Sequence, residues 1–269
     1  MNPLSNTLHA WRRTSFVIGW RSRVVALLCA RYGNLSRSRS LIRSLIYSVI
    51  GLFSRNDEVI VTFRSSERPF TASLRKNNES DYLVFGEITM GAYPLSNLPI
   101  KTPDHVIDGG ANIGLFSLLA HAAFPHASLT CYEPDPDNVA QIRKNFAANG
   151  IEAEVFEMGL WSSTMDLFFH SAMSYSGTVS QVPSGNPVSC VLPEIPSNSL
   201  LKLDVEGAEY EVLPALFNAG RFPITILMEI HEFDSRGESI LDLLRTNGYR
   251  WRESFSPSER CVNLCAVKG

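Results

Sequence analysis

The first 55 residues of this chain contain no aspartate, no glutamate and no lysine, although they contain nine arginines. The remaining residues contain 15 basic and 27 acidic side chains, so the N-terminal segment carries +9, the rest carries −12, and the total is −3. Such a split indicates that residues 1–55 form a basic extension of a different kind from the globular chain that follows.

Long apolar runs are also absent from this extension. Arginines such as Arg21, Arg23 and Arg43 interrupt its apolar stretches, and none reaches the ~18 residues of a membrane span. We expect amphipathic helices, with three interpretations open: helices docked on the acidic remainder of the chain, a peripheral contact with an anionic membrane, or an organellar transit peptide. Charges inside the apolar stretches disfavour a secretory signal, and no aromatic platform or known module supports a nucleic-acid partner.

Cysteines are few and lack paired spacing. There are five of them, an odd number, and none belongs to a Cys/His group with zinc-ligand spacing. We interpret them as reduced packing residues of a cytoplasmic protein, with membrane association through residues 1–55 as the alternative. The sequence assigns no metal ligand, and metal dependence stays open.

A glycine-rich turn stands out in the remainder. Residues 106–114 read VIDGGANIG, in which a short apolar strand ends at Asp108 and leads into Gly109, Gly110 and Gly114. Glycines at such a turn adopt positive φ angles and let the backbone approach a ligand closely. The segment therefore predicts a ligand-binding strand–turn–helix unit.

A second acid follows the next predicted strand. Residues 128–132 form that strand, and Glu133 lies 25 positions after Asp108, about one βαβ step. A carboxylate at this position can accept hydrogen bonds from both hydroxyls of a ribose. Asp108 would repel a pyrophosphate but attract the sulfonium and amino groups of S-adenosylmethionine. The glycines also fit a relaxed form of the dinucleotide-binding fingerprint. An NAD(P)-dependent oxidoreductase is therefore the alternative.

Strands and helices alternate along the rest of the chain and end in a predicted antiparallel pair, residues 249–255 and 261–267. This order predicts an α/β fold with a doubly wound sheet and one reversed terminal strand. The Ser/Gly/Pro-rich residues 171–186 are expected to form a loop, and a substrate lid is one role for it. The expected organisation is a basic helical extension, a strand/helix lead-in and a cofactor-binding domain, at residues 1–55, 56–104 and 105–269.

Three motifs carry a family resemblance. Residues 106–114, the triplet YEP at 132–134 and LKLDVEGAEYEVL at 201–213 resemble the FkbM family of S-adenosylmethionine-dependent methyltransferases. The resemblance covers about residues 56–268 and implies a Rossmann-like class I methyltransferase fold. It also implies methyl transfer to a hydroxyl of a sugar, glycan or polyketide-like metabolite. Gly109, where a branched apolar residue is more usual, and Pro214, inside a predicted helix, depart from the family pattern.

The topology and the resemblance together predict the site. Ligands of open α/β sheets bind at the carboxyl ends of the strands, so the glycine turn, the acid after the second strand and the tips of the third and fourth strands should hold the cofactor. The expected cofactor-binding residues are Asp108, Gly109, Gly110, Ala111, Asn112, Gly114, Glu133, Pro134, Gly159, Leu160 and Asp204.

An alcohol acceptor needs a group that removes its proton. The candidates are Asp204, Glu206 and His231: Asp204 is placed best by topology, and His231 has an unperturbed pKa of roughly 6.5, closest to neutrality. Glu206 could instead cap a helix, His231 could instead hydrogen-bond at a strand end, and Glu209 is expected to be a solvated helix residue. A membrane-attached binding protein with an inactive methyltransferase domain remains a further alternative.

Overall fold

The computed structural model describes residues 17–33, 40–64, 69–95, 98, 100, 102–172, 176–183, 185–258 and 260–269. Parts of the predicted extension, residues 1–16 and 34–39, therefore lie outside the described residues. The chain divides into two compact units, Met1–Ala92 with Ala147–Gly150, and Tyr93–Phe146 with Ile151–Gly269. None of the described helices is long and apolar enough to cross a membrane.

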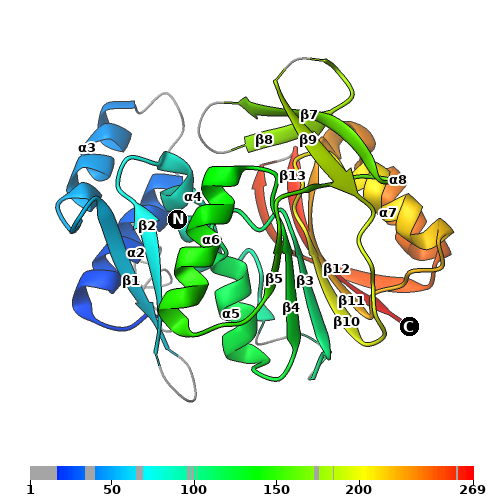
Figure 1. The fold of residues 1–269 in the computed structure, drawn as a ribbon, viewed down its shortest axis with the longest axis horizontal. Helices are drawn as coiled ribbons and strands as arrows, with labels where there is room; N and C mark the ends of the chain where they lie inside the picture. The colour runs from blue at the N-terminus through cyan, green and yellow to red at the C-terminus, as the bar shows by residue number, and fades with distance from the viewer. Residues whose placement is uncertain are drawn as a thin grey trace, which may run out of the picture. The chain divides into compact units, whose positions relative to one another are not determined.

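The first unit combines helices with a two-stranded sheet. Its elements are α2 (Trp20–Gly33), α3 (Ser40–Gly51), β1 (Glu58–Phe63), β2 (Phe70–Arg75) and α4 (Glu79–Met90) (Figure 1). The two strands pair antiparallel, and α2 packs against α4 and β1. A side chain on Gly86 of α4 would place its Cβ only 2.6 Å from the carbonyl oxygen of Cys29, so this glycine lets the two helices approach closely.

The second unit is built on a seven-stranded sheet with the order β12-β13-β11-β10-β3-β4-β5. Neighbouring strands from β11 to β5 are parallel, whereas β13 is antiparallel to both β11 and β12. The doubly wound sheet with one reversed terminal strand is thus confirmed. The strands are β3 (His105–Gly109), β4 (Ser128–Tyr132), β5 (Glu154–Phe156), β10 (Ser199–Leu203), β11 (Thr225–His231), β12 (Tyr249–Ser258) and β13 (Cys261–Lys268).

Helices cover both faces of this sheet. Figure 1 shows α5 (Leu115–Ala123) and α6 (Pro136–Asn149) on one side, and α7 (Glu209–Asn218) and α8 (Phe233–Thr246) on the other. Because the central strands are covered on both faces, every residue of β10 is buried. Helix α7 continues through Pro214 to Asn218.

A second sheet of the same unit corrects one expectation. Its order is β6-β9-β7-β8, with β6 (Gly159–Leu160), β7 (Met165–Ala172), β8 (Ser176–Ser180) and β9 (Asn186–Val191). Of the segment expected to be a loop, residues 171–172 and 176–180 are strand, because β7 and β8 pair antiparallel. Its Ser/Gly content misled the interpretation: a Cβ on Gly177 would lie 2.2 Å from Cζ of Phe169, so the glycine accommodates an aromatic ring across the hairpin.

Candidate active site

The glycine turn after β3 lies directly against the end of β10. Gly110 has φ of +74°, and a Cβ there would lie 1.8 Å from the carbonyl oxygen of Asp204. The N–H groups of Gly110 and Ala111 both donate to the carbonyl of Tyr132, each at 3.0 Å. Asn112 also has a positive φ, +50°. The turn thus joins the carboxyl ends of three neighbouring strands, which is where the sequence predicted a ligand.

Leu160 explains the departure from the family pattern at Gly109. A Cβ on Gly109 would lie 2.6 Å from Cδ1 of Leu160 and 3.2 Å from the carbonyl oxygen of Lys202. The leucine therefore fills the volume that a branched residue at 109 would need. Gly159, the residue before it, is buried and would bring a Cβ to 2.8 Å from Sγ of Cys190.

Glu133 is buried at the end of β4 and connects the two predicted cofactor motifs. Its carboxylate accepts hydrogen bonds from the N–H of Asn112 at 2.7 Å, the N–H of Asp135 at 3.1 Å and Nδ2 of Asn138 at 3.2 Å. Burial raises the pKa of Glu133 to about 7, and these hydrogen bonds oppose that rise. A carboxylate has about four acceptor positions, so one more donor can be accommodated. Pro134 follows and is half-buried.

A buried lysine, which the sequence reasoning missed, lies beneath the glycine turn. Lys202 Nζ donates to the carbonyl of Gly110 at 2.6 Å and lies 3.3 Å from Oδ1 of Asp108 and 3.6 Å from Oδ2 of Asp204. Asp108 is fully buried and also accepts from Oγ of Ser117 at 2.6 Å. Burial lowers the pKa of Lys202, but the two carboxylates outweigh that effect and raise it overall. A charged residue inside the apolar run of residues 200–203 was the available signal.

Asp204 is partly open and is held by a tyrosine far away in sequence. Its side chain is 26% exposed, and Oδ2 accepts a hydrogen bond from the hydroxyl of Tyr93 at 2.7 Å. The two residues are 111 positions apart in the sequence. Local pattern reasoning could not have found this contact.

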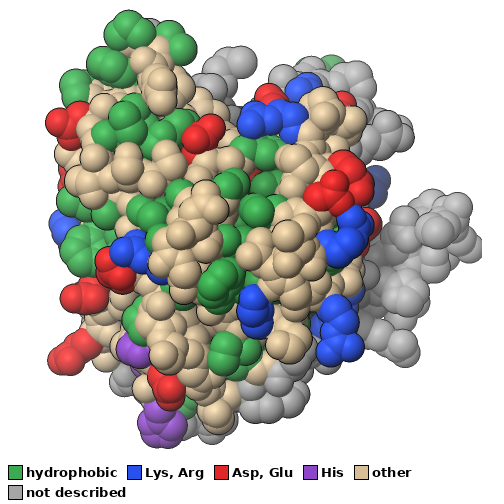
Figure 2. Space-filling view, turned by 90° about the vertical axis from the view of Figure 1, so that its right-hand side faces the viewer, with side chains coloured by type: hydrophobic (Ala, Val, Ile, Leu, Met, Phe, Trp, Pro, Cys, Tyr) green, Lys and Arg blue, Asp and Glu red, His purple; other side chains and the backbone are tan. Residues whose placement is uncertain are grey.

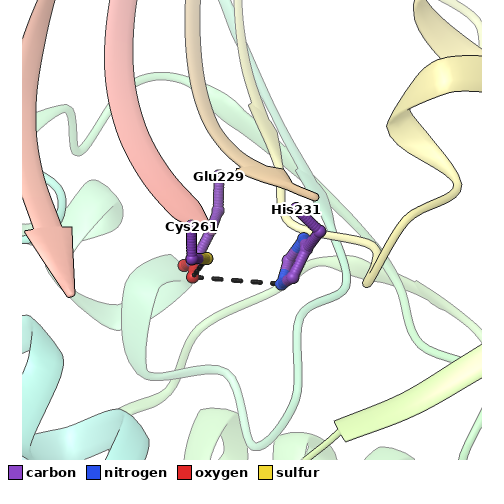
Figure 3. A group of neighbouring side chains, drawn as sticks. All are labelled: Glu229, His231 and Cys261. Carbon is purple, nitrogen blue, oxygen red and sulfur yellow. Dashed lines mark hydrogen bonds and ion pairs between the residues drawn. The ribbon is translucent and has the colours of Figure 1, made fainter. Parts of the chain in front are cut away.

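His231, the last residue of β11, lies among carboxylates from three segments. Its Nε2 is 3.2 Å from Oε2 of Glu206 and 3.9 Å from Oε1 of Glu229, while its Nδ1 is 3.3 Å from Oε1 of Glu209. Figure 3 shows the ring directed toward Glu229, beside Cys261. Burial lowers the pKa of His231, but contacts with Cys261, Glu206 and Glu209 outweigh it and raise the pKa well above its usual range. The three candidate bases, Asp204, Glu206 and His231, do come together: their ligand atoms lie within 4.8 Å of one another.

The expectation that Glu209 is solvated is wrong. The residue is fully buried, and its carboxylate accepts from the N–H of Gly207 at 2.8 Å and the N–H of His231 at 2.6 Å. It therefore ties the start of α7 to the end of β11. A glutamate in the first turn of a helix is normally solvated, but here the neighbouring strand supplies donors that offset the cost of burial.

These features define a class of protein. A parallel α/β sheet with one reversed terminal strand, a glycine turn after β3 and an acid after β4 are the features of a class I methyltransferase domain. The profile of the Methyltransferase FkbM domain matches residues 108–251. The chain belongs to this family, whose cofactor is S-adenosylmethionine.

Individual relatives are distant. The 31-O-demethyl-FK506 methyltransferase FkbM of Streptomyces tacrolimicus is 26% identical over 213 residues, covering 64% of this chain and 82% of that protein. Hexuronic acid methyltransferase AglP of Haloferax volcanii is 28% identical over 137 residues, covering 48% and 56%. Methyltransferase 1 of Beauveria bassiana is 23% identical over 150 residues, covering 44% of this chain and 60% of that protein. The chain therefore spans less than two thirds of the length of the Beauveria and Haloferax proteins. The crystal structure of Methyltransferase FkbM from Methylobacillus flagellatus KT has a TM-score of 0.47 and 16% identity, covering 70% of this chain and 54% of that one.

Proposed function

We propose that the chain transfers a methyl group from S-adenosylmethionine to a hydroxyl oxygen of a small molecule or sugar. One observation carries this proposal: the partly exposed carboxylate of Asp204 lies at the end of β10, where its backbone touches the glycine turn. A proton acceptor is thereby held next to the predicted cofactor site, which is what an alcohol acceptor requires.

The residues present fit the cofactor. The turn from Gly109 to Gly114 would hold the methionine end, Glu133 and Pro134 would border the ribose, and Gly159 with Leu160 would border the adenine. The positive φ angles in the turn and the remaining acceptor position of Glu133 support this assignment. When bound, S-adenosylmethionine supplies the methyl group and the leaving group. Asp108, fully buried against Lys202, would act by holding the turn in place.

Asp204 suits the role of base better than His231. Tyr93 and Lys202 both approach Oδ2 of Asp204, which leaves Oδ1 to accept the acceptor's proton. The new O–C bond would form as the S–C bond breaks, and the hydroxyl proton would pass to this carboxylate. Both ring nitrogens of His231 already face carboxylates, Nε2 that of Glu206 and Nδ1 that of Glu209, so Asp204 is better placed to take up the acceptor's proton.

The acceptor class is inferred from relatives and surface chemistry. The named relatives include a methyltransferase of 31-O-demethyl-FK506 and one of hexuronic acid, both of which are hydroxyl-bearing small compounds or sugars. On the face shown in Figure 2, acidic and basic side chains are interspersed rather than gathered into a basic stripe. A nucleic-acid acceptor would favour such a stripe, so this face gives it no support.

Two measurements test the proposal. Thermal unfolding with S-adenosylhomocysteine, NAD and NADP should show a stabilising shift for the first ligand alone; a shift with NAD or NADP instead would favour the oxidoreductase alternative. Incubation with methyl-labelled cofactor and a panel of hydroxylated sugars and metabolites should give an alkali-stable methyl ether. Cofactor binding without methylation of any tested compound would favour the inactive binding domain.

A further inference from the structure

Three candidate bases form a group with the composition and spacing of a metal site. The ligand atoms of Asp204, Glu206 and His231 lie within 4.8 Å of one another, and all three side chains are partly open. We propose that they bind one divalent cation, Mg²⁺ or Mn²⁺. The role of this cation in methyl transfer rests on the proposed function. Binding of the cation does not depend on that function.

The histidine is oriented as a metal ligand. Its Nδ1 is buried, makes no hydrogen bond among the residues that the structure describes, and lies 3.3 Å from Oε1 of Glu209. Its Nε2 lies on the other side of the ring, toward Glu206. A ligating histidine is generally held by a carboxylate at its second nitrogen, which fixes the ring and the tautomer. Fully buried Glu209, itself held by two backbone N–H groups, can serve this purpose.

Charge balance also favours a cation. Five carboxylates surround this end of the sheet, and among the described residues the basic groups recorded against them are Lys202 and His231, of which His231 is neutral when it binds a cation. Partly buried carboxylates without enough counter-charge are costly. A divalent cation would offset that excess. The carboxylates are those of Asp108, Asp204, Glu206, Glu209 and Glu229.

The donor set decides the class of cation. Carboxylate and solvent or acceptor oxygens, which would supply most of the donors here, suit Mg²⁺ or Mn²⁺, and the one imidazole makes Mn²⁺ the better fit of the two. A neighbouring set of Glu229, His231 and Cys261 has the zinc-like combination of sulfur, nitrogen and oxygen (Figure 3). In that set the thiol of Cys261 donates to Glu229, and Nδ2 of Asn263 donates to the same carboxylate at 3.1 Å. The carboxylate of Glu229 and the thiol of Cys261 therefore already have partners. We assign the cation to the set of Asp204, Glu206 and His231 instead.

A cation here would change how the acceptor is activated. A hydroxyl bound to a divalent cation loses its proton more readily than a free one. Asp204 would then serve as a ligand, and the hydroxyl proton would pass to water as the O–C bond forms and the S–C bond breaks. Turnover should consequently depend on the added cation.

Cation binding can be measured without any acceptor. Mn²⁺ would be titrated into the full chain, and free Mn²⁺ followed by electron paramagnetic resonance, for wild type, Glu206→Gln, His231→Gln and Glu209→Gln. Glu211→Gln, an exposed position on the same helix as Glu209, is the matched control. We expect one site in wild type and in the control, at least tenfold weaker binding in the two ligand variants, and about 10–100-fold weaker binding in Glu209→Gln.

Affinity for S-adenosylhomocysteine and thermal unfolding verify that each variant is folded. Competition by Mg²⁺ would support the assignment. The proposal is overturned if wild type binds no Mn²⁺ at millimolar concentration, or if the control loses as much affinity as His231→Gln. Mn²⁺ binding in a protein that methylates nothing would leave the cation site standing and reject the proposed function instead.

A separate observation concerns helix α3 of the first unit. Leu41 and Leu45 are 85% and 65% exposed, and Leu52, just after the helix, is 81% exposed. Their spacing of four and seven places them on one side, whereas Ile46 and Ile50 on the opposite side are buried. Apolar residues thus occupy both sides of α3, and those on one side are exposed in the part of the chain that the structure describes. Exposed apolar side chains grouped on one side of a helix indicate an interaction site.

The positive charge around α3 indicates which partner binds its exposed leucines. The uncovered side is close in sequence to exposed Arg55, and a surface cavity of about 410 Å³ brings Leu52 together with Trp20, Arg21 and Arg55. The first 55 residues contain nine arginines and no acid. We infer, as a second and independent proposal, that this face rests on an anionic lipid bilayer, with leucines and Trp20 in the interface and arginines on the headgroups.

Vesicle sedimentation tests this proposal. The full chain should sediment with vesicles of phosphatidylcholine and phosphatidylserine at low salt, and binding should weaken several-fold at high salt. Leu41→Ser/Leu45→Ser/Leu52→Ser should lose binding, whereas the control Val182→Ser/Phe222→Ser/Ile224→Ser, at exposed apolar positions of the second unit, should retain it. Indifference of wild type to anionic vesicles at low salt, or equal binding by the leucine variant, rejects the lipid surface in favour of docking on protein.

Discussion

Glu133 provides a sharp test of the cofactor site, because its ionisation should control affinity near neutral pH. Burial raises the pKa of this carboxyl to about 7, against the three donors that favour the ionised form. Ribose hydroxyls donate best to the ionised carboxylate. We therefore expect S-adenosylhomocysteine to bind more tightly as pH rises through about 7, with release of a proton on binding.

The magnitude follows from the fraction of ionised carboxylate. At one pH unit below a pKa of about 7, roughly one tenth of the groups is ionised, so affinity at pH 6 should be about tenfold weaker than at pH 8, or about 1.4 kcal/mol. Glu133→Gln removes the titration and exchanges charge-assisted hydrogen bonds for weaker ones. It should cost about 1.5–3 kcal/mol for each bond lost at pH 8, and its affinity should be nearly independent of pH. Glu152→Gln, at an exposed position nearby in sequence, should behave like wild type.

Titration calorimetry at pH 6, 7 and 8, in buffers of different ionisation enthalpy, measures both affinity and proton release. The same raised pKa has an opposite effect on the cofactor-free protein. Because the pKa is higher in the folded than in the unfolded state, the contribution to stability is complete below about 4.5 and is lost as pH rises toward 7. Equal affinities at pH 6 and pH 8 in wild type, or an unchanged pH dependence in Glu133→Gln, would show that this carboxylate does not bind the ribose.

The remaining predictions concern the turn and the acids around it. Asp204→Asn should leave cofactor affinity within about tenfold but lower turnover by roughly 10²–10⁴, whether Asp204 acts as base or as ligand; a dead His231→Gln enzyme beside an active Asp204→Asn enzyme would reverse the roles. Lys202→Met should destabilise the fold by about 3–5 kcal/mol, because it leaves the buried Asp108 charge unpaired, and adding Asp108→Asn should recover part of that loss in urea unfolding. Gly110→Ala should abolish cofactor binding measured by calorimetry, because its Cβ would lie 1.8 Å from a carbonyl oxygen; retained binding would show that the turn adapts.

The sheet was predictable because its signals are local. Apolar strands alternate with helices, and each strand and its following turn lie within a few residues of sequence, as at 106–114 and 128–133. The reversed strand β13 was predicted from two neighbouring strand-like segments near residues 249–255 and 261–267, with no helical pattern between them. The hairpin formed by β7 and β8 was missed because its second strand is rich in serine and glycine, residues that usually mark loops.

The candidate site was predictable only in part. Asp204 and His231 follow from the rule that ligands lie at the carboxyl ends of strands, and the structure brings them together with Glu206. Glu229 lies two residues before the end of β11 and was overlooked. Side chains alternate along a strand, so this pattern already placed Glu229 on the same side as His231. Leu160 shows a different limit, because its contact with Gly109 depends on the packing of β6 and not on any nearby residue.

Lys202 combines a local sequence signal with contacts that depend on tertiary packing. The lysine itself is visible in the sequence as one charge in an apolar strand, but its meaning depends on partners from three segments: Asp108, Asp204 and the carbonyl of Gly110. A buried ammonium is tolerated only with such partners, so an isolated lysine in a predicted central strand should prompt a search for carboxylates at the neighbouring strand ends. Asp108 is the residue found that way here, because β3 pairs with β10 in a register that puts Lys202 opposite Asp108. The same register places the glycine turn over the lysine, so the cofactor site and the buried ion pair are one unit, and a change in either should affect the other.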